Sequence, residues 1–259
     1  MNHFYLLRML TQKEITARYK SSVLGMAWSV LNPFFQFLIY YYVFSIVLRA
    51  KWRMPDAELP EAASPFMLFL GLATFSFLSE TLARSPLLLR EHGNFIKKII
   101  FPIEILPLTL VFSSLYSLGI SYALMIALYC LMVGCPPAAA FLLPLLLVPL
   151  VLLALGAAYV LSAVGVYFQD LAHLIPPVNM ACMFVTPILY PLSLVPQQYL
   201  WIIHLNPLTW IVEMLRNAFF AGRGPDWTAY GLLCGGALLF CVVSRFFFEK
   251  MRKGFADEL

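Results

Sequence analysis

The sequence predicts an all-α polytopic membrane protein, a single transmembrane domain over residues 1–259 with six spanning helices. Three observations predict this class. The chain is 62% hydrophobic and only 12% charged, whereas soluble domains are typically about 25% charged. Residues 21–48 contain no charged side chain, and about 20 apolar residues suffice for a helix to cross a bilayer. The run is apolar throughout rather than alternating, which favours a helix over a barrel strand.

An amphipathic helix is expected over residues 1–20, ahead of the first span. Phe4, Leu7 and Leu10 fall on one side, and Arg8 and Lys13 lie elsewhere. This spacing is typical of a helix that lies in the cytoplasmic interface of a membrane. A frayed terminus is the alternative. No cleavable signal peptide is expected, because the apolar run that follows is long enough for a full span.

Six spans follow from the runs of sequence that are poor in charge. We expect them at residues 21–48, 62–83, 103–133, 138–168, 171–190 and 227–247. The third and fourth spans share an uncharged stretch that Gly134-Cys135-Pro136-Pro137 divides, since glycine and proline interrupt helices. An even number of spans places both termini on the same side of the membrane.

The distribution of lysine and arginine predicts that both termini are cytoplasmic. Of the 17 basic residues, 12 lie in segments on the side of the termini and 5 lie in segments on the other side. Basic residues concentrate in short cytoplasmic loops. The net charge of +4 is therefore interpreted as a signal of membrane orientation, and no nucleic-acid partner is expected.

No catalytic centre and no metal site are expected in this chain. It lacks the GxxxxGK[ST] phosphate loop, the GxGxxG fingerprint and the HExxH zinc motif. Its four histidines lie in different segments, and its five cysteines form no CxxC pair, so we interpret the cysteines as small apolar residues. If ATP energises this protein, another chain must bind the ATP.

An aromatic stripe runs along the first span. Phe34, Phe37, Tyr41 and Phe44 follow one another at intervals of three or four residues, so they share one helix face. Aromatic rings stack on the C–H faces of sugars, so such a stripe could line a channel that conducts a sugar chain. Contact with lipid as part of an interfacial aromatic belt is the alternative.

A cytoplasmic element is expected at residues 84–100, between the second and third spans. Ser85-Pro86 is a helix-start signal and Gly93 a stop signal. A short, partly apolar helix in this position favours docking to a partner protein. The alternative is a membrane-surface helix with snorkelling lysines. Just before it, Glu80 can pair with Arg84 four residues later.

Short apolar segments follow the fifth span, over residues 191–222. Residues 196–204 and 207–220 are too short to span a bilayer and too apolar to form a free loop. We interpret them as re-entrant helices at the outer face, where interrupted backbone must be buried or line a cavity. A pore mouth is the natural inference. Further on, the GxxxG spacing of Gly231 and Gly235 favours close helix packing, within one chain or between two.

The order and spacing of several motifs over about 200 residues resemble the permease subunit of type-2 ABC exporters for cell-surface polysaccharides, which include O-antigen and teichoic-acid export permeases. The matching motifs are Arg18-Tyr19-Lys20-Ser21-Ser22-Val23-Leu24-Gly25 with Trp28 and Leu31-Asn32-Pro33, Phe77 to Glu80, Asn94-Phe95-Ile96-Lys97-Lys98 with Phe101-Pro102 and Glu104-Ile105-Leu106-Pro107, Thr186 to Pro191, and Asn206-Pro207-Leu208-Thr209 with Glu213 and Arg216. One departure is Gln169, where an arginine is common in the family.

The resemblance implies an assembly and a substrate. The chain would form a homodimer in the bacterial cytoplasmic membrane, together with two copies of a separate ABC ATPase. ATP and magnesium would bind to that partner, so this chain would not be an enzyme and would carry no cofactor. The substrate would be a lipid-linked polysaccharide, an O-antigen-like glycan on a polyprenyl diphosphate.

The resemblance also implies roles for particular residues. The aromatic stripe of Phe34, Phe37, Tyr41 and Phe44 would line the channel. The outer gate would comprise Pro187, Tyr190, Trp201, Asn206 and Trp210. The residues that dock on the ATPase would be Leu87, Leu88, Arg90, Glu91, His92 and Asn94.

Other functions are possible on this sequence. A related exporter for a teichoic acid, a capsule glycan, or a small lipid or drug would share the fold. A membrane-embedded glycosyl- or phosphotransferase would need clustered carboxylates near the interface, and Glu80, Glu104 and Asp170 are scattered along the chain. The exporter is therefore the favoured hypothesis.

Overall fold

The computed structural model describes residues 3–20, 22–48, 60–93 and 102–258. This part of the chain is helical and contains no strand. Its α-helices are α1 (His3–Ala17), α2 (Trp28–Tyr41), α3 (Ser64–Arg84), α4 (Leu88–Glu91), α6 (Ile105–Met132), α7 (Leu143–Leu146), α8 (Val148–Tyr167), α9 (Leu171–Val185), α10 (Leu200–Leu205), α11 (Pro207–Phe220), α12 (Trp227–Met251) and α13 (Phe255–Glu258).

The chain is a multi-pass membrane protein, as the sequence predicts. Together with the 3₁₀ and π turns that continue them, five helical segments of the described residues are long and apolar enough to cross a membrane. They correspond to the first, second, third, fourth and sixth predicted spans: Gly25–Val47, Ser64–Glu91, Ile105–Met132, Ala138–Tyr167 and Trp227–Gly254.

The predicted fifth span, residues 171–190, is represented by the shorter helix α9. This helix is apolar but has only 15 residues, which cover about 22 Å against a hydrocarbon core of about 30 Å. The helix ends at Val185, and Thr186 is in an extended conformation. The total of six spans therefore stays a prediction.

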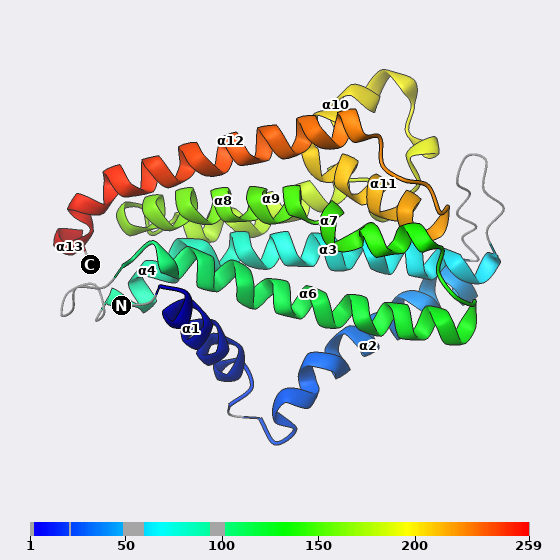
Figure 1. Ribbon diagram of the computed structural model, residues 1–259, viewed down its shortest axis with the longest axis horizontal. Coiled ribbons are helices and arrows are strands. Elements are labelled where there is room, and N and C mark those ends of the chain that lie inside the picture. Colours follow the sequence, from blue (N-terminus) through cyan, green and yellow to red (C-terminus); the bar gives the residue numbers. More distant parts are fainter. Residues whose placement is uncertain (1–2, 21, 49–59, 94–101, 259) are drawn as a thin grey trace.

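The long helices α3, α6, α8 and α12 run side by side, and α3 lies at the centre of the bundle (Figure 1). In the most apolar 18 residues of the span that contains α3, 67% of the residues are buried. The corresponding share in the other four spans is 11–28%. The start of α1 and the end of α12 lie at the same end of the molecule, whereas α1 and α2 form a V beside α6 (Figure 1). Both termini therefore lie at one end, consistent with an even number of crossings.

The second span and the predicted cytoplasmic helix form one continuous element, which corrects the prediction of a separate helix starting at Ser85. Helix α3 passes through a 3₁₀ turn, Ser85–Leu87, directly into α4. Ser85 has helical dihedral angles, and its hydroxyl donates back to the carbonyl of Thr81 at 2.6 Å. Pro86 has no N–H to donate, so it tightens the helix locally instead of beginning a new one.

Glycines of α8 allow it to pack very closely on its neighbours. A Cβ atom added to Gly165 would lie 2.2 Å from the carbonyl oxygen of Pro86, and one added to Gly156 would lie 2.6 Å from a ring of α12. By contrast, Cβ atoms added to Gly231 and Gly235 would meet no atom of the described residues within 4 Å. Packing among these residues therefore does not explain the GxxxG spacing.

Candidate functional site

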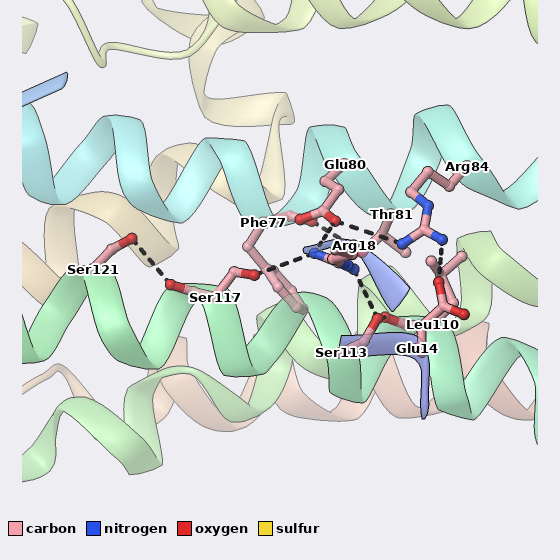
Figure 2. A network of polar contacts seen from close by, with 10 residues as sticks. All are labelled: Glu14, Arg18, Phe77, Glu80, Thr81, Arg84, Leu110, Ser113, Ser117 and Ser121. Carbon is pink, nitrogen blue, oxygen red and sulfur yellow. Dashed lines mark hydrogen bonds and ion pairs between the residues drawn. The ribbon is translucent and has the colours of Figure 1, made fainter. Parts of the chain in front are cut away.

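An ion-pair network ties the N-terminal helix to the bundle (Figure 2). Arg18, just after α1, places Nη1 2.5 Å from the Oε1 of Glu80 in α3. Its Nη2 donates to the hydroxyl of Ser113 in α6 at 2.8 Å. Arg84 pairs with Glu14 of α1 and lies 3.7 Å from Glu80. The predicted pair of Glu80 and Arg84 is confirmed, but Glu80 is closer to Arg18, which the sequence analysis did not identify as its partner.

This network fixes α1 on α3 and α6. It balances two arginines with two glutamates, and their side chains are only 17–33% exposed, so the pairs are less screened than surface pairs. Burial raises the pKa of the adjacent Tyr19 phenol, and the Arg18 guanidinium opposes this rise. A helix is observed over His3–Ala17 in place of a frayed terminus, and its position in the membrane interface stays a prediction.

A groove of about 710 Å³ opens between α1, the start of the first span and α6. The predicted apolar face of α1 lines it through Phe4 and Leu7, together with Arg8, and α6 contributes Phe112 and Tyr116. Phe4 is 74% exposed. The helix therefore presents an apolar side to an open groove as well as packing on the bundle.

The predicted docking residues divide into a buried and an exposed set. Leu88 is buried, whereas Leu87 and Glu91 are exposed. His92 is half-buried, and its Nδ1 lies 2.9 Å from the carbonyl oxygen of Leu88. Asn94 lies outside the described residues. The buried Leu88 holds the element on the bundle. Among the predicted docking residues that the structure describes, Leu87 and Glu91 are the most accessible to a partner.

Arg90, predicted to dock on a partner, contacts the end of α8. Its Nε and Nη2 donate to the carbonyls of Gly165 and Val166, at 3.2 and 2.7 Å. With the amide of Gln169 turned to satisfy its hydrogen bonds, the amide oxygen accepts from Nη1 of Arg90 at 2.7 Å. A positive charge near the C-terminus of a helix is favourable. Arg90 therefore caps α8, and Gln169 completes that contact.

The aromatic stripe faces the interior of the chain. Phe37 is only 2% exposed and packs on the rings of Phe66 and Phe69 in α3. The prediction that Phe37 lines a channel is corrected accordingly, because α3 covers that side chain. Tyr41 and Phe44 are half-buried against the same core. Phe34 is also half-buried, and the channel role of these three residues stays a prediction.

Two short helices occur where the sequence predicts re-entrant segments. Asn206 caps α11: its Oδ1 accepts from the N–H of Leu208 at 3.0 Å, and its Nδ2 donates to the hydroxyl of Thr186 at 2.8 Å. Residue Thr186 is fully buried. Asn206 therefore joins the start of α11 to the turn after α9.

The other predicted gate residues lie on both sides of this joint. Trp201 and Trp210 are 63% and 39% exposed, and the indole of Trp210 donates to the carbonyl of His204 at 2.8 Å. The phenol of Tyr190 donates to the carbonyl of Phe184 at 2.7 Å. The two tryptophans are available to contact another molecule, and their gating role stays a prediction.

Arg216 is the residue whose surroundings the sequence analysis missed. The expected pair with Glu213 is confirmed at 3.1 Å. However, Arg216 is only 2% exposed, and its guanidinium also donates to carbonyls of α3 and of Pro187 and Ile188. An ionisable side chain buried in a membrane protein is a candidate functional group. The pair of Glu213 and Arg216 at helical spacing in a mostly apolar segment was the available signal.

The polar groups of the described residues can hold helices together and position them. In that part of the chain, no three His, Cys, Asp or Glu side chains come close enough to bind a metal ion. The five cysteines are free thiols. The chemistry that the structure displays is thus ion pairing and hydrogen bonding at the two ends of α3.

Comparison with known proteins gives a consistent result over almost the whole chain. Residues 5–220 match the family described as ABC-2 type transporter. The chain is 28% identical over 256 residues to the O-antigen export system permease protein RfbA of Myxococcus xanthus. This alignment covers 98% of this chain and 95% of that protein. It is 28% identical to the RfbA protein of Klebsiella pneumoniae, with 99% and 95% covered. It is 25% identical to the polysialic acid transport protein KpsM of Escherichia coli, with 81% and 79% covered.

Proposed function

We propose that this chain, which belongs to the ABC-2 type transporter family, is the permease subunit of a polysaccharide exporter. The observation that carries this proposal is the similarity to O-antigen export permeases over 98–99% of the chain. The five helical segments able to cross a membrane are in keeping with it. The proposed transport function therefore rests on a match that extends over almost all of these residues.

The working assembly would be a homodimer of this chain with two copies of an ABC ATPase. It would lie in the bacterial cytoplasmic membrane with both termini in the cytoplasm. The glycan would be carried on a polyprenyl diphosphate, and the energy would come from ATP and magnesium bound to the ATPase. This chain would bind no cofactor and catalyse no reaction itself.

Particular residues would act at three places along the transport path. Leu87 and Glu91 are exposed at the end of the α3–α4 element and would contact the ATPase. Phe34, Tyr41 and Phe44 would contribute to the channel at the partly covered face of the first span, Gly25–Val47. The exposed Trp201 and Trp210 would form the outer gate, because broad aromatic faces can stack on sugar rings.

A capsule polysaccharide is the second candidate substrate. The similarity to KpsM, whose name describes polysialic acid transport, favours it. That match covers less of the chain than the matches to the O-antigen permeases. The O-antigen-like glycan is therefore the first substrate to test.

The test is export in cells together with biochemistry of the purified complex. The chain would be expressed with the ABC ATPase encoded beside it, in a strain that makes a lipid-linked O-antigen but lacks its own export permease. We expect a stable complex, ATP hydrolysis that depends on lipid, and glycan at the cell surface. A matched control carries an ATPase with an inactive ATP site. Failure of the chain to bind any ABC ATPase, or glycan that stays in the cytoplasm, would contradict the proposal.

A further inference from the structure

Helix α3 is anchored by charged side chains at both of its ends, and these anchors hold the two regions that a transporter must move together. We infer that α3 couples the cytoplasmic docking element to the outer gate, and that Arg216 is the positioning residue that fastens the gate to α3. This inference rests on the proposed function, because it assigns a mechanical role within the exporter.

The outer anchor is the set of hydrogen bonds that the guanidinium of Arg216 donates, which we call the clasp. Nε of Arg216 donates to the carbonyl of Met67 in α3 at 3.3 Å. Nη1 donates to the carbonyl of Pro187 at 2.7 Å and to Glu213 at 3.1 Å. Nη2 donates to the carbonyl of Ile188 at 3.0 Å. A planar guanidinium can bind several acceptors at once in a fixed geometry, so α11, α3 and the segment after α9 are held together.

The carbonyls of Pro187 and Ile188 explain why this segment needs a clasp. The segment lies in the turn that follows α9, so no regular helical ladder satisfies its backbone. Both residues are buried, and unsatisfied carbonyls are costly away from water. Arg216 supplies the missing donors, and Glu213 balances the buried charge. Arg216 therefore binds this segment to α3 and α11, alongside the hydrogen bond from Asn206 to Thr186 and the core packing of Ile188.

Gly71 makes room for the clasp on the surface of α3. A Cβ atom there would lie 2.9 Å from Nη2 of Arg216 and 3.3 Å from the Cγ2 of Ile188. The absence of a side chain lets the guanidinium lie directly against the backbone of α3. Gly71 therefore offers an independent way to disturb the clasp without removing its charge.

The inner anchors fix the other end of the same helix. Glu80 and Arg84 bind α1 through the network described above, and α3 continues through the 3₁₀ turn at Ser85–Leu87 into α4, which ends at Glu91. From Met67 to Glu91 the helical rise is about 36 Å, at 1.5 Å per residue. The turn at Ser85–Leu87 packs closely on α8 at Gly165, so we expect displacement of the docking element at Glu91 to be passed along α3 to the clasp at Met67.

The experiment compares ATP hydrolysis with export in the intact permease–ATPase complex. Arg216→Gln is expected to assemble, to keep hydrolysis within about twofold of the unmodified chain, and to lower export at least tenfold. Gly71→Ala is expected to lower export about threefold or more with hydrolysis retained. Arg216→Lys should recover part of the export, because it restores the charge but not the fork of donors. Arg245→Gln is the matched control, since Arg245 forms an ion pair with Glu249 at an exposed site of α12, and it should change neither quantity.

The outcomes separate the coupling role of Arg216 and α3 from the proposed export function of the whole chain. Normal export by Arg216→Gln, or hydrolysis and export that fall in the same proportion, would overturn the coupling role. If Arg216→Gln does not assemble, Gly71→Ala decides, and unchanged export in that variant overturns the proposal. Absence of export by the unmodified chain would instead overturn the proposed function. Export by the unmodified chain and by both variants would overturn the clasp alone.

Discussion

Helix α8 contacts the turn that leads into α4 at Gly165. Among the glycines of the described residues, Gly165 leaves the least room for a Cβ atom. This contact gives a clear prediction for Gly165→Ala. The new Cβ atom would lie 2.2 Å from the carbonyl oxygen of Pro86 and 2.7 Å from its Cα. Ordinary contacts are 3.4 Å or longer, and the obstructing atoms are backbone atoms that cannot rotate away. Overpacking typically costs about 1–3 kcal/mol, and occasionally more.

Two opposing effects set the net change for Gly165→Ala. Alanine favours the helix over glycine by about 1 kcal/mol. The new Cβ atom would lie more than 1 Å closer to the backbone oxygen of Pro86 than an ordinary contact allows, so we take about 3 kcal/mol for the clash. The net loss in the free energy of unfolding is then about 2 kcal/mol. For a chain of this size, that loss corresponds to a drop of roughly 4–8 °C in the melting temperature.

The assay is thermal unfolding of the purified chain in detergent, followed by size-exclusion chromatography with fluorescence detection. Gly119→Ala in α6 is the matched control, since a Cβ atom there would meet nothing within 4 Å. We expect the control to melt at the same temperature as the unmodified chain or slightly above it. If Gly165→Ala melts as high as Gly119→Ala, the reasoning about this contact is refuted.

Three further predictions follow from the burial of individual side chains. Phe37→Ala should destabilise the fold by about 3–5 kcal/mol and lower the folded yield, because Phe37 is a core residue; Phe35→Ala, at a position 50% exposed, should not, and equal yields would contradict this. Glu80→Gln should cost about 1–2 kcal/mol by leaving Arg18 half-buried without its carboxylate, seen as faster hydrogen exchange in α1; unchanged exchange would count against the network. Leu87→Asp should weaken co-purification with the ATPase at least tenfold while the melting temperature stays the same, and undiminished binding would remove Leu87 from the docking surface.

Much of the fold could be predicted because the hydropathy of a single segment determines whether that segment can cross the membrane as a helix. Each spanning helix must satisfy its own backbone hydrogen bonds, so its existence depends on local composition and not on its neighbours. The helix starts at Asn206-Pro207 follow the same logic, since the cap and its N–H partner lie two residues apart. The predicted α11 is observed with the expected bounds.

The candidate site could be predicted only in part, because its partners are distant in the sequence. The pairs of Glu80 with Arg84 and of Glu213 with Arg216 were visible at helical spacing. The contact of Arg18 with Glu80 joins separate helices, and Arg216 reaches the carbonyl of Met67 across 149 residues. No local pattern specifies such a contact, since it depends on which helices pack together.

The sequence by itself determined that this chain is a multi-pass helical membrane protein and that its motifs resemble those of an exporter permease. Only the tertiary structure decided that Phe37 lies in the core, that Ser85-Pro86 continues a helix, and that Arg216 is buried in a cage of carbonyls. The physical reason is that apolarity and capping are properties of a segment. Burial, in contrast, is a property of the surfaces that segments present to one another once they are packed.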